Sequence, residues 1–249
     1  MKYLKKIKIA GITMLFLTIL SCSLEPEIGS TVTYFPDITL KGATIVFVPL
    51  GSAYNDPGVS ATENGVAIEY TSTAVGVNRK SNKLDTNIQD EYIQTYKATN
   101  KDGFANTVTR TVIVYKTGDL VNSIEGVYTS TAARNGSTPS AAYRDMKYIY
   151  IWKNTDGTYE ISDAFGGWYP IARAIANSNT PGGKMNAVNI STNTFTFPGN
   201  PMTNTYFGGV ATLTAVTVNP ATKKVVVSCD WDTGTTLYKF VSTLTQVQL

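Results

Sequence analysis

Short apolar runs separated by turn residues, with no sustained helical period after residue 22, are the feature that most constrains this fold. A strand predicted at 92–98 leads into a hairpin turn at 100–103 and then into a long strand at 107–115. The turn contains Asp-Gly, and glycine takes the positive φ of such turns without steric cost. About six or seven strands in roughly 80 residues, over 36–116, are typical of a β-sandwich.

The second half of the chain carries the same strand signals. A strand predicted at 146–153 alternates aromatic and aliphatic residues, which indicates that both of its faces are covered. Its aromatic face is Tyr148, Tyr150 and Trp152, and its aliphatic face is Ile149 and Ile151. Further strands are predicted at 158–162, 186–191, 194–197, 210–218, 224–231 and 235–241. The chain is therefore predicted to be all-β: a sandwich at 36–116, followed by a small antiparallel β-barrel or sandwich domain at 117–249.

The first residues indicate export. Residues 1–21 have the features of a secretory signal peptide, with four lysines before an apolar run too short to span a bilayer. A small residue precedes Cys22, and this order resembles the bacterial lipobox, which implies acylation of Cys22. An ordinary cleaved signal with a nearby cysteine is the alternative. Residues 22–35 are predicted to be a tether, in which Glu25 and Glu27 resemble the acidic export signal of surface-exposed lipoproteins in Bacteroidetes.

The net charge changes meaning once this signal is set aside. The whole chain has 21 basic and 18 acidic residues, a net charge of +3. Four of the lysines lie in residues 1–21, so the chain from Cys22 onward carries 17 basic and 18 acidic side chains, a net charge of −1. No basic excess remains for binding nucleic acid. The partner predicted from this part of the sequence is the outer membrane, through a lipid on Cys22.

The residue inventory narrows the possible chemistry. Histidine is absent, which excludes a Ser-His or Cys-His nucleophile pair, an imidazole base and a His-ligated zinc or haem. Two cysteines cannot form a four-cysteine zinc site, and Cys229, in an apolar run, is predicted to be a buried structural thiol. Asp230-x-Asp232-x-Gly234 faintly resembles a calcium loop but lacks its later ligands. No catalytic residue, metal site or cofactor is therefore predicted.

The segment 36–116 carries turn and strand motifs in a specific order. They are Gly51-Ser-Ala-Tyr54-Asn-Asp56-Pro57-Gly58-Val59-Ser-Ala61, Asn64-Gly65, Tyr92, Tyr96-Lys-Ala98-Thr-Asn100-Lys-Asp102-Gly103 and Arg110-Thr-Val112-Ile-Val114. This pattern resembles the bacterial Ig-like surface domain first noted in a pesticidal crystal protein. The resemblance implies an Ig-like β-sandwich that serves as a spacer or adhesion module. The stretch 77–90 departs from the pattern, with extra polar residues where a short hairpin is expected.

A second set of motifs lies within 122–249. It consists of Ile124-Glu-Gly126-Val-Tyr128, Tyr159-Glu-Ile161-Ser-Asp163-Ala-Phe-Gly166-Gly167-Trp168-Tyr169, and Trp231 in a late strand. This region resembles a domain of unknown function that is paired with the Ig-like module in Bacteroidetes surface lipoproteins. The resemblance implies an accessory outer-membrane lipoprotein of the kind often encoded with glycan-uptake machinery, and it implies no established chemistry.

The candidate ligand-binding residues are Asp163, Trp168, Tyr169 and Trp231. Gly166-Gly167 allows a sharp turn that would present Trp168 and Tyr169 at a rim beside Asp163. Aromatic rings pack on the apolar C–H faces of sugars, and a carboxylate accepts hydrogen bonds from sugar hydroxyl groups. The alternative is that the tryptophans close the core and the aspartates cap turns.

The function predicted from these features is noncatalytic glycan binding in a polysaccharide-uptake system. The expected partners are polysaccharides or oligosaccharides and other proteins of the uptake system. A structural or adhesive module that contacts another protein is one alternative. A carboxylate-based glycoside hydrolase is another, although the spacing of the acidic residues selects no catalytic pair.

Overall fold

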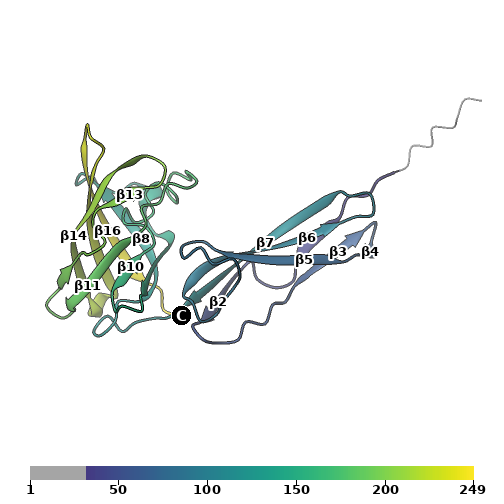
Figure 1. Cartoon of the computed structure of the whole chain (residues 1–249), viewed down its shortest axis with the longest axis horizontal. Helices are drawn as coiled ribbons and strands as arrows, with labels where there is room; N and C mark the ends of the chain where they lie inside the picture. Colours follow the sequence, from purple (N-terminus) through teal and green to yellow (C-terminus); the bar gives the residue numbers. More distant parts are fainter. Residues whose placement is uncertain (1–31) are drawn as a thin grey trace, which may run out of the picture. The chain divides into compact units, whose positions relative to one another are not determined.

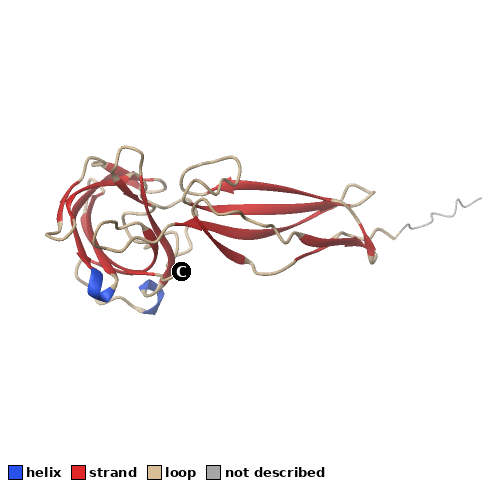
Figure 2. Cartoon of the chain, turned by 90° about the horizontal axis from the view of Figure 1, so that it is seen from below, coloured by secondary structure: helices blue, strands red, loops and turns tan. Residues whose placement is uncertain are grey.

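Strands make up nearly all of the regular structure between residues 32 and 249, the part of the chain that the computed structural model describes (Figure 1). Figure 2 shows the strands in red and two short 3₁₀ turns, at Ala141–Tyr143 and Pro220–Thr222, in blue. The predicted signal peptide at 1–21, the predicted acylation site Cys22 and most of the tether at 22–35 lie outside the described residues. Within 32–249, no helix has the length and apolarity needed to cross a membrane. The predicted all-β class is confirmed.

The first domain is a sandwich of two sheets. One sheet has the order β1-β3-β4, with β1 at Asp37–Leu40, β3 at Val59–Glu63 and β4 at Val66–Ala67. The other has the order β2-β7-β6-β5, with β2 at Ile45–Pro49, β7 at Ala105–Tyr115, β6 at Asp90–Thr99 and β5 at Tyr70–Gly76. β2 pairs with β7 in parallel, and the other pairs are antiparallel. Two sheets in this arrangement confirm the predicted sandwich.

An ion pair between a buried arginine and a partly exposed aspartate ties the turn at 55–58 to the strand pair β6 and β7. The side chain of Arg110 on β7 is fully buried, and its Nη1 lies 2.6 Å from Oδ1 of Asp56. The same guanidinium donates to the Tyr96 hydroxyl at 2.7 Å and to the Ala43 carbonyl at 3.0 Å. A buried charge is costly unless it is paired and hydrogen-bonded. The motif residues of the sandwich therefore have structural partners inside the sandwich itself.

The segment 77–90, where the sequence departs from the Ig-like pattern, forms a loop at 77–89 between β5 and β6 and ends at Asp90, the first residue of β6. The carboxylate of Asp90 organises this loop. It accepts hydrogen bonds from the backbone N–H groups of Asn78 and Arg79, at 3.0 and 2.9 Å, and from the Asn78 side-chain amide at 2.9 Å. One acidic side chain at the start of β6 thus supplies the hydrogen bonds that the expected short hairpin would have made between its strands.

The second domain is one sheet of nine strands that curls on itself (Figures 1 and 2), which matches the predicted barrel-like domain. Its order is β12-β11-β10-β9-β8-β16-β15-β14-β13 and every pairing is antiparallel. The strands are β8 at Gly126–Arg134, β9 at Met146–Lys153, β10 at Tyr159–Ile161, β11 at Gly183–Asn189, β12 at Thr194–Thr196, β13 at Met202–Asn204, β14 at Gly208–Asn219, β15 at Lys224–Asp232 and β16 at Leu237–Gln246.

Cys229 on β15 is fully buried, and burial raises the pKa of its thiol to about 12, as expected of a structural cysteine.

Side-chain amides attach two connecting segments to this curled sheet. The amide of Asn200 donates to the carbonyl of Leu213 on β14 and accepts from its N–H group, both at 2.9 Å. The amide of Asn204 on β13 donates to the Ser178 carbonyl at 2.6 Å and to the Thr180 hydroxyl at 3.0 Å. These amides therefore attach the connection between β12 and β13 to β14, and the long loop between β10 and β11 to β13.

Strand β9 is covered on both faces, as the alternation of its residues predicts. Ile149 and Ile151 belong to the core of the second domain. Tyr150 and Trp152, on the other face, join a separate cluster with Ile113 of the sandwich. The Tyr150 hydroxyl also donates to the carboxylate of a sandwich glutamate, Glu91, at 2.6 Å. The predicted aromatic face of β9 is thus a contact within the chain and not an exposed surface.

Candidate functional site

The long loop at 162–182, here called the plug segment, packs inside one end of the curled sheet. Its residues Ala164, Phe165, Trp168 and Tyr169 belong to the core of the domain. Gly166 and Gly167 have φ values of +64° and +86°, which confirms the predicted sharp turn. Gly166 lies so close to Ser242 on β16 that a Cβ atom there would overlap the serine side chain. The glycines therefore let the chain turn inward, against the sheet.

Asp163 fixes this turn from within the core. Its carboxylate accepts hydrogen bonds from the backbone N–H groups of Gly167 at 2.7 Å, Thr180 at 2.8 Å and Phe165 at 3.3 Å. Burial raises the pKa of Asp163 to about 6, although the three N–H groups act in the opposite direction. The predicted hydrogen bonds from Asp163 to a sugar do not fit this geometry, because its side chain is buried and its oxygens already have backbone donors.

The prediction that Trp168 and Tyr169 lie at a rim is wrong. Trp168 and Tyr169 are each 5% exposed and Trp231 is 4% exposed, because the glycine turn directs the plug segment into the domain. The structure nevertheless brings the three predicted aromatic residues together. Tyr169 lies 5.8 Å from Trp231, and Trp168 and Trp231 both pack on Phe240, at 5.6 and 6.4 Å between ring centroids. These rings form a buried layer beneath the surface.

Two exposed aromatic residues, Tyr206 and Phe207, lie above this layer on the turn between β13 and β14. Phe207 packs on Tyr169 and Trp231, with centroids 4.8 and 6.3 Å away. Tyr206 packs on Phe207 at 4.8 Å. The turn is held in place because the Trp231 indole donates to the Gly208 carbonyl at 3.0 Å. The buried residues thus act as a rigid support for two rings that face solvent.

Tyr206 and Phe207 are not among the predicted binding residues, although the sequence contains a signal for them. They precede Gly208-Gly209, and Trp168-Tyr169 follow Gly166-Gly167, so each aromatic pair adjoins a glycine pair. At the Tyr206-Phe207 pair, Asn204 turns the chain outward, because its side-chain oxygen accepts hydrogen bonds from the backbone N–H groups of Tyr206 and Phe207 at 3.1 and 2.8 Å. An asparagine two residues before such a pair is typical of an Asx turn.

Cationic side chains lie next to these aromatic rings. The guanidinium of Arg134, at the end of β8, lies 5.1 Å from the Trp168 ring centroid and 5.0 Å from that of Tyr238. Burial raises the pKa of the Tyr169 hydroxyl, and the nearby charges of Arg134 and Arg173 act against this rise.

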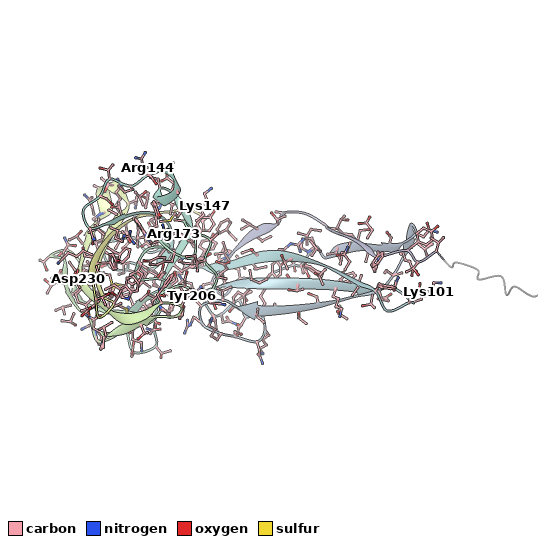
Figure 3. All side chains as sticks on the ribbon, turned by 90° about the horizontal axis from the view of Figure 1, so that it is seen from above. Lys101, Arg144, Lys147, Arg173, Tyr206 and Asp230 are labelled. Carbon is pink, nitrogen blue, oxygen red and sulfur yellow. The ribbon has the colours of Figure 1, made fainter. Side chains whose placement is uncertain are left out.

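We call this end of the domain the barrel mouth; it consists of Arg134, Tyr169, Arg173, Tyr206, Phe207 and Tyr238. Figure 3 looks down on it, with Arg173 and Tyr206 labelled.

The two aspartates beside Trp231 have other partners. Asp230 pairs with Lys239 on the neighbouring strand at 3.3 Å, and Asp232 accepts from the Gly234 N–H group at 2.8 Å. Strand alternation turns their side chains away from the face that Trp231 shares with the core. The faint calcium-loop pattern is therefore a strand end and a hairpin turn, and no group of three metal-ligating side chains occurs within 32–249.

Comparison with known proteins identifies both halves of the chain. Residues 38–114 match the family model of the bacterial surface protein Ig-like domain. Residues 117–246, more than half of the chain, match a family model described as a C-terminal domain. The chain belongs to this family. A solved structure, that of the lipoprotein BT2262 from Bacteroides thetaiotaomicron, is similar to 84% of the chain and 99% of that protein, at 25% identity and a TM-score of 0.59. No match was found among curated proteins.

These findings confirm the resemblance inferred from the sequence motifs. The chain is a bacterial surface protein in which an Ig-like domain is followed by a C-terminal β domain. The C-terminal domain, matched over residues 117–246, contains the plug segment, the buried aromatic layer and the barrel mouth.

Proposed function

We propose that this protein is a noncatalytic glycan-binding lipoprotein whose binding surface is the barrel mouth. The observation that carries the proposal is the pair of exposed rings on a rigid support. Tyr206 and Phe207 are 64% and 43% exposed, and both rest, directly or through each other, on the buried rings of Tyr169 and Trp231. A site whose rings are already fixed before binding loses little side-chain entropy when a sugar packs on them.

Polar groups around the rings complement the hydroxyl groups of a sugar. The hydroxyl of Tyr206 and the guanidinium of Arg173 belong to exposed side chains at the mouth. A sugar presents apolar C–H faces and polar edges, so a ring with hydrogen-bonding groups beside it can recognise both. The four predicted binding residues then act indirectly: Asp163 holds the plug segment, and Trp168, Tyr169 and Trp231 support the exposed rings.

The rest of the chain suits a role at the cell surface. We include in the proposal a lipid on Cys22 that anchors the protein to the outer membrane, and an accessory role in a polysaccharide-uptake system. The Ig-like sandwich would then serve as a spacer between the membrane and the mouth. Retention of acylated protein in outer-membrane fractions, and its loss when Cys22 is replaced by alanine, tests the anchor separately from glycan binding.

Glycan binding is tested by affinity electrophoresis through gels that contain one polysaccharide each. The wild-type protein should be retarded by at least one polymer, and the double variant Tyr206→Ala/Phe207→Ala should lose that retardation. The matched control is Phe35→Ala/Phe104→Ala, since these rings are exposed to 65% and 45% and also pack at 4.8 Å, but lie in the sandwich. The control should migrate like wild type.

Two results would contradict this proposal. If no polysaccharide retards the wild-type protein, the proposed glycan binding is wrong. Release of reducing sugar from a bound polymer, abolished by substituting a carboxylate, would replace the noncatalytic function by hydrolysis.

A contact with another protein is a second candidate, favoured by one observation. Val210 and Leu237 are both more than half exposed, and they flank Asp232 on the outer face of the strands beside the mouth. Exposed aliphatic side chains suit a protein surface better than a sugar. Replacing both with serine should leave glycan retardation unchanged if the mouth binds glycans. The adhesive function is tested by pull-down of a partner protein from the same outer membrane. It is supported if the two substitutions abolish that capture and no polysaccharide retards the wild-type protein.

A further inference from the structure

The barrel mouth contains two arginines, of which Arg134 interacts with the Tyr169 hydroxyl and with aromatic rings. Arg134 faces the rings of Trp168 and Tyr238, and Arg173 is exposed on the plug segment. Within residues 32–249, neither arginine forms an ion pair with a carboxylate. The indole N–H of Trp168, which is buried, also lacks an acceptor in the described part of the chain. A buried donor without an acceptor is uncommon and calls for an explanation.

The aspartates at 163, 230 and 232, which lie beside the buried aromatic layer in the sequence, all have other partners. Asp163 accepts three backbone N–H groups in the core, Asp230 pairs with Lys239, and Asp232 closes its own turn. Arginine remains charged at every physiological pH, and its planar fork of donors matches the oxygens of a carboxylate or a sulfate. Two guanidinium groups close to Tyr169, on which the exposed ring of Phe207 packs, therefore suit a sugar that carries an anionic substituent.

We propose that the barrel mouth selects acidic glycans, in which Tyr206 and Phe207 contact the sugar ring and Arg173, with Arg134, contacts its carboxylate or sulfate. This inference rests on the proposed function and names its ligand class. From Cys22 onward the chain is nearly neutral, so its overall charge does not attract acidic polymers. The selectivity for acidic glycans would therefore come from the two arginines at the mouth.

The test compares acidic polymers with neutral polymers of related backbone in affinity gels. Polygalacturonate is set against highly methyl-esterified pectin, and dextran sulfate against dextran, with alginate as a second uronate. We expect at least tenfold tighter binding of one acidic polymer than of its neutral partner. That affinity should fall as salt rises from about 50 to 200 mM, since salt screens charge at a partly exposed site. The carboxylate and sulfate arms identify which anion is recognised.

Arg173→Gln provides the matched change at the mouth, because it removes the charge and keeps a polar side chain of similar length. It should weaken binding of the acidic polymer about fivefold or more and leave any binding of the neutral partner unchanged. Lys101→Gln removes one positive charge from an exposed turn of the sandwich, far from the mouth in sequence, and should behave like wild type. This control separates recognition at the mouth from a general effect of net charge.

Each outcome decides the proposal. Tighter binding of an acidic polymer that Arg173→Gln reduces and Lys101→Gln does not supports it. Equal binding of acidic and neutral polymers, sensitive to Tyr206→Ala/Phe207→Ala but not to Arg173→Gln, overturns acidic selectivity and leaves the glycan-binding function standing. Absence of retardation by every polymer overturns both.

Discussion

The sandwich and the barrel domain treat buried polar groups in different ways. In the sandwich, Arg110 pairs with Asp56 and Tyr96, so the charge is neutralised by side chains of the same domain. In the barrel domain, Asp163 is buried without a cation, Arg134 faces aromatic rings without a carboxylate, and the Trp168 indole N–H has no acceptor among the described residues. The sandwich thus neutralises its buried arginine with its own side chains, although the buried Oε1 of Gln89 has no partner among the described residues. The barrel domain leaves charges and a donor without such partners, and the proposed binding surface lies at the same end of that domain.

The largest effect is expected from breaking the pair in the sandwich. Arg110→Met should destabilise the sandwich by about 3–5 kcal/mol, because it leaves the Asp56 carboxylate without its cation. The lower end of that range applies, since the Asp56 side chain is 32% exposed. All three tryptophans lie in the barrel domain, and Trp152 also packs against the sandwich. In a Trp152→Phe background the fluorescence of the other two during urea unfolding therefore reports the barrel domain, and circular dichroism reports both domains.

An exposed ion pair supplies the control for this prediction. Lys239→Met breaks the pair with Asp230, in which the lysine side chain is 64% exposed, and should cost no more than about 0.5 kcal/mol. Similar losses of unfolding free energy for Arg110→Met and Lys239→Met would contradict a stabilising network of polar contacts around Arg110. The network is supported further if only Arg110→Met makes the sandwich unfold at lower urea than the barrel domain, so that the circular dichroism and fluorescence transitions separate.

The next largest effect concerns the plug segment. Gly166→Ala should destabilise the barrel domain by about 2–4 kcal/mol, because the new methyl group overlaps Ser242 and the residue keeps a φ of +64°. Gly157→Ala is the matched control: its φ is +86°, but nothing lies within 4 Å of the added Cβ. It should cost about 1 kcal/mol, from backbone strain alone. Equal losses for the two variants in tryptophan-detected unfolding would mean that the plug segment is not packed against β16.

A smaller effect is expected from titration of Asp163. Burial raises its pKa from 3.8 to about 6, so the folded state binds this proton more tightly than the unfolded chain. Its contribution to stability is full below the unfolded pKa and is lost as the pH rises through the folded pKa. Relative to Asp163→Asn, which does not titrate, wild type should therefore lose up to about 3 kcal/mol of unfolding free energy between about pH 4 and 7.

Comparing the two proteins cancels the other titrating groups. A stability difference that stays constant across this pH range would mean that the three backbone N–H groups keep the Asp163 carboxylate ionised at an ordinary pKa. In that case the barrel domain would satisfy its buried charge as completely as the sandwich does.

The sandwich could be predicted from sequence because its signals are local. The turn residues at 55–58 and 100–103 and the alternating strands that follow them act within a few neighbours. In the barrel domain most strands were predicted for the same reason, but β8 and β13 were not. β8 is rich in small and polar residues because Ser130 packs against Gly166 of the plug segment, a contact between residues distant in the chain.

Of the residues at the barrel mouth only Tyr169 was among the four predicted binding residues, and the rim position predicted for it was wrong. Gly166-Gly167 indicates a sharp turn, yet the direction of that turn depends on Phe240 and Trp231, which lie on strands that follow much later. Whether an aromatic residue is core or surface is thus a non-local property. Tyr206 and Phe207 were within reach of sequence reasoning, because Asn204 and the glycine pair mark an outward turn.

The most direct test of the central claim compares one ring at the mouth with one ring in the sandwich. Phe207 and Phe104 are exposed to 43% and 45%, so their alanine variants remove rings of the same type and similar exposure. With the polysaccharide that retards wild type most strongly, the dissociation constant is measured for both variants. We predict that Phe207→Ala weakens binding about tenfold, or about 1.4 kcal/mol, and that Phe104→Ala leaves it unchanged. Equal affinities for the two variants would contradict glycan binding at the barrel mouth.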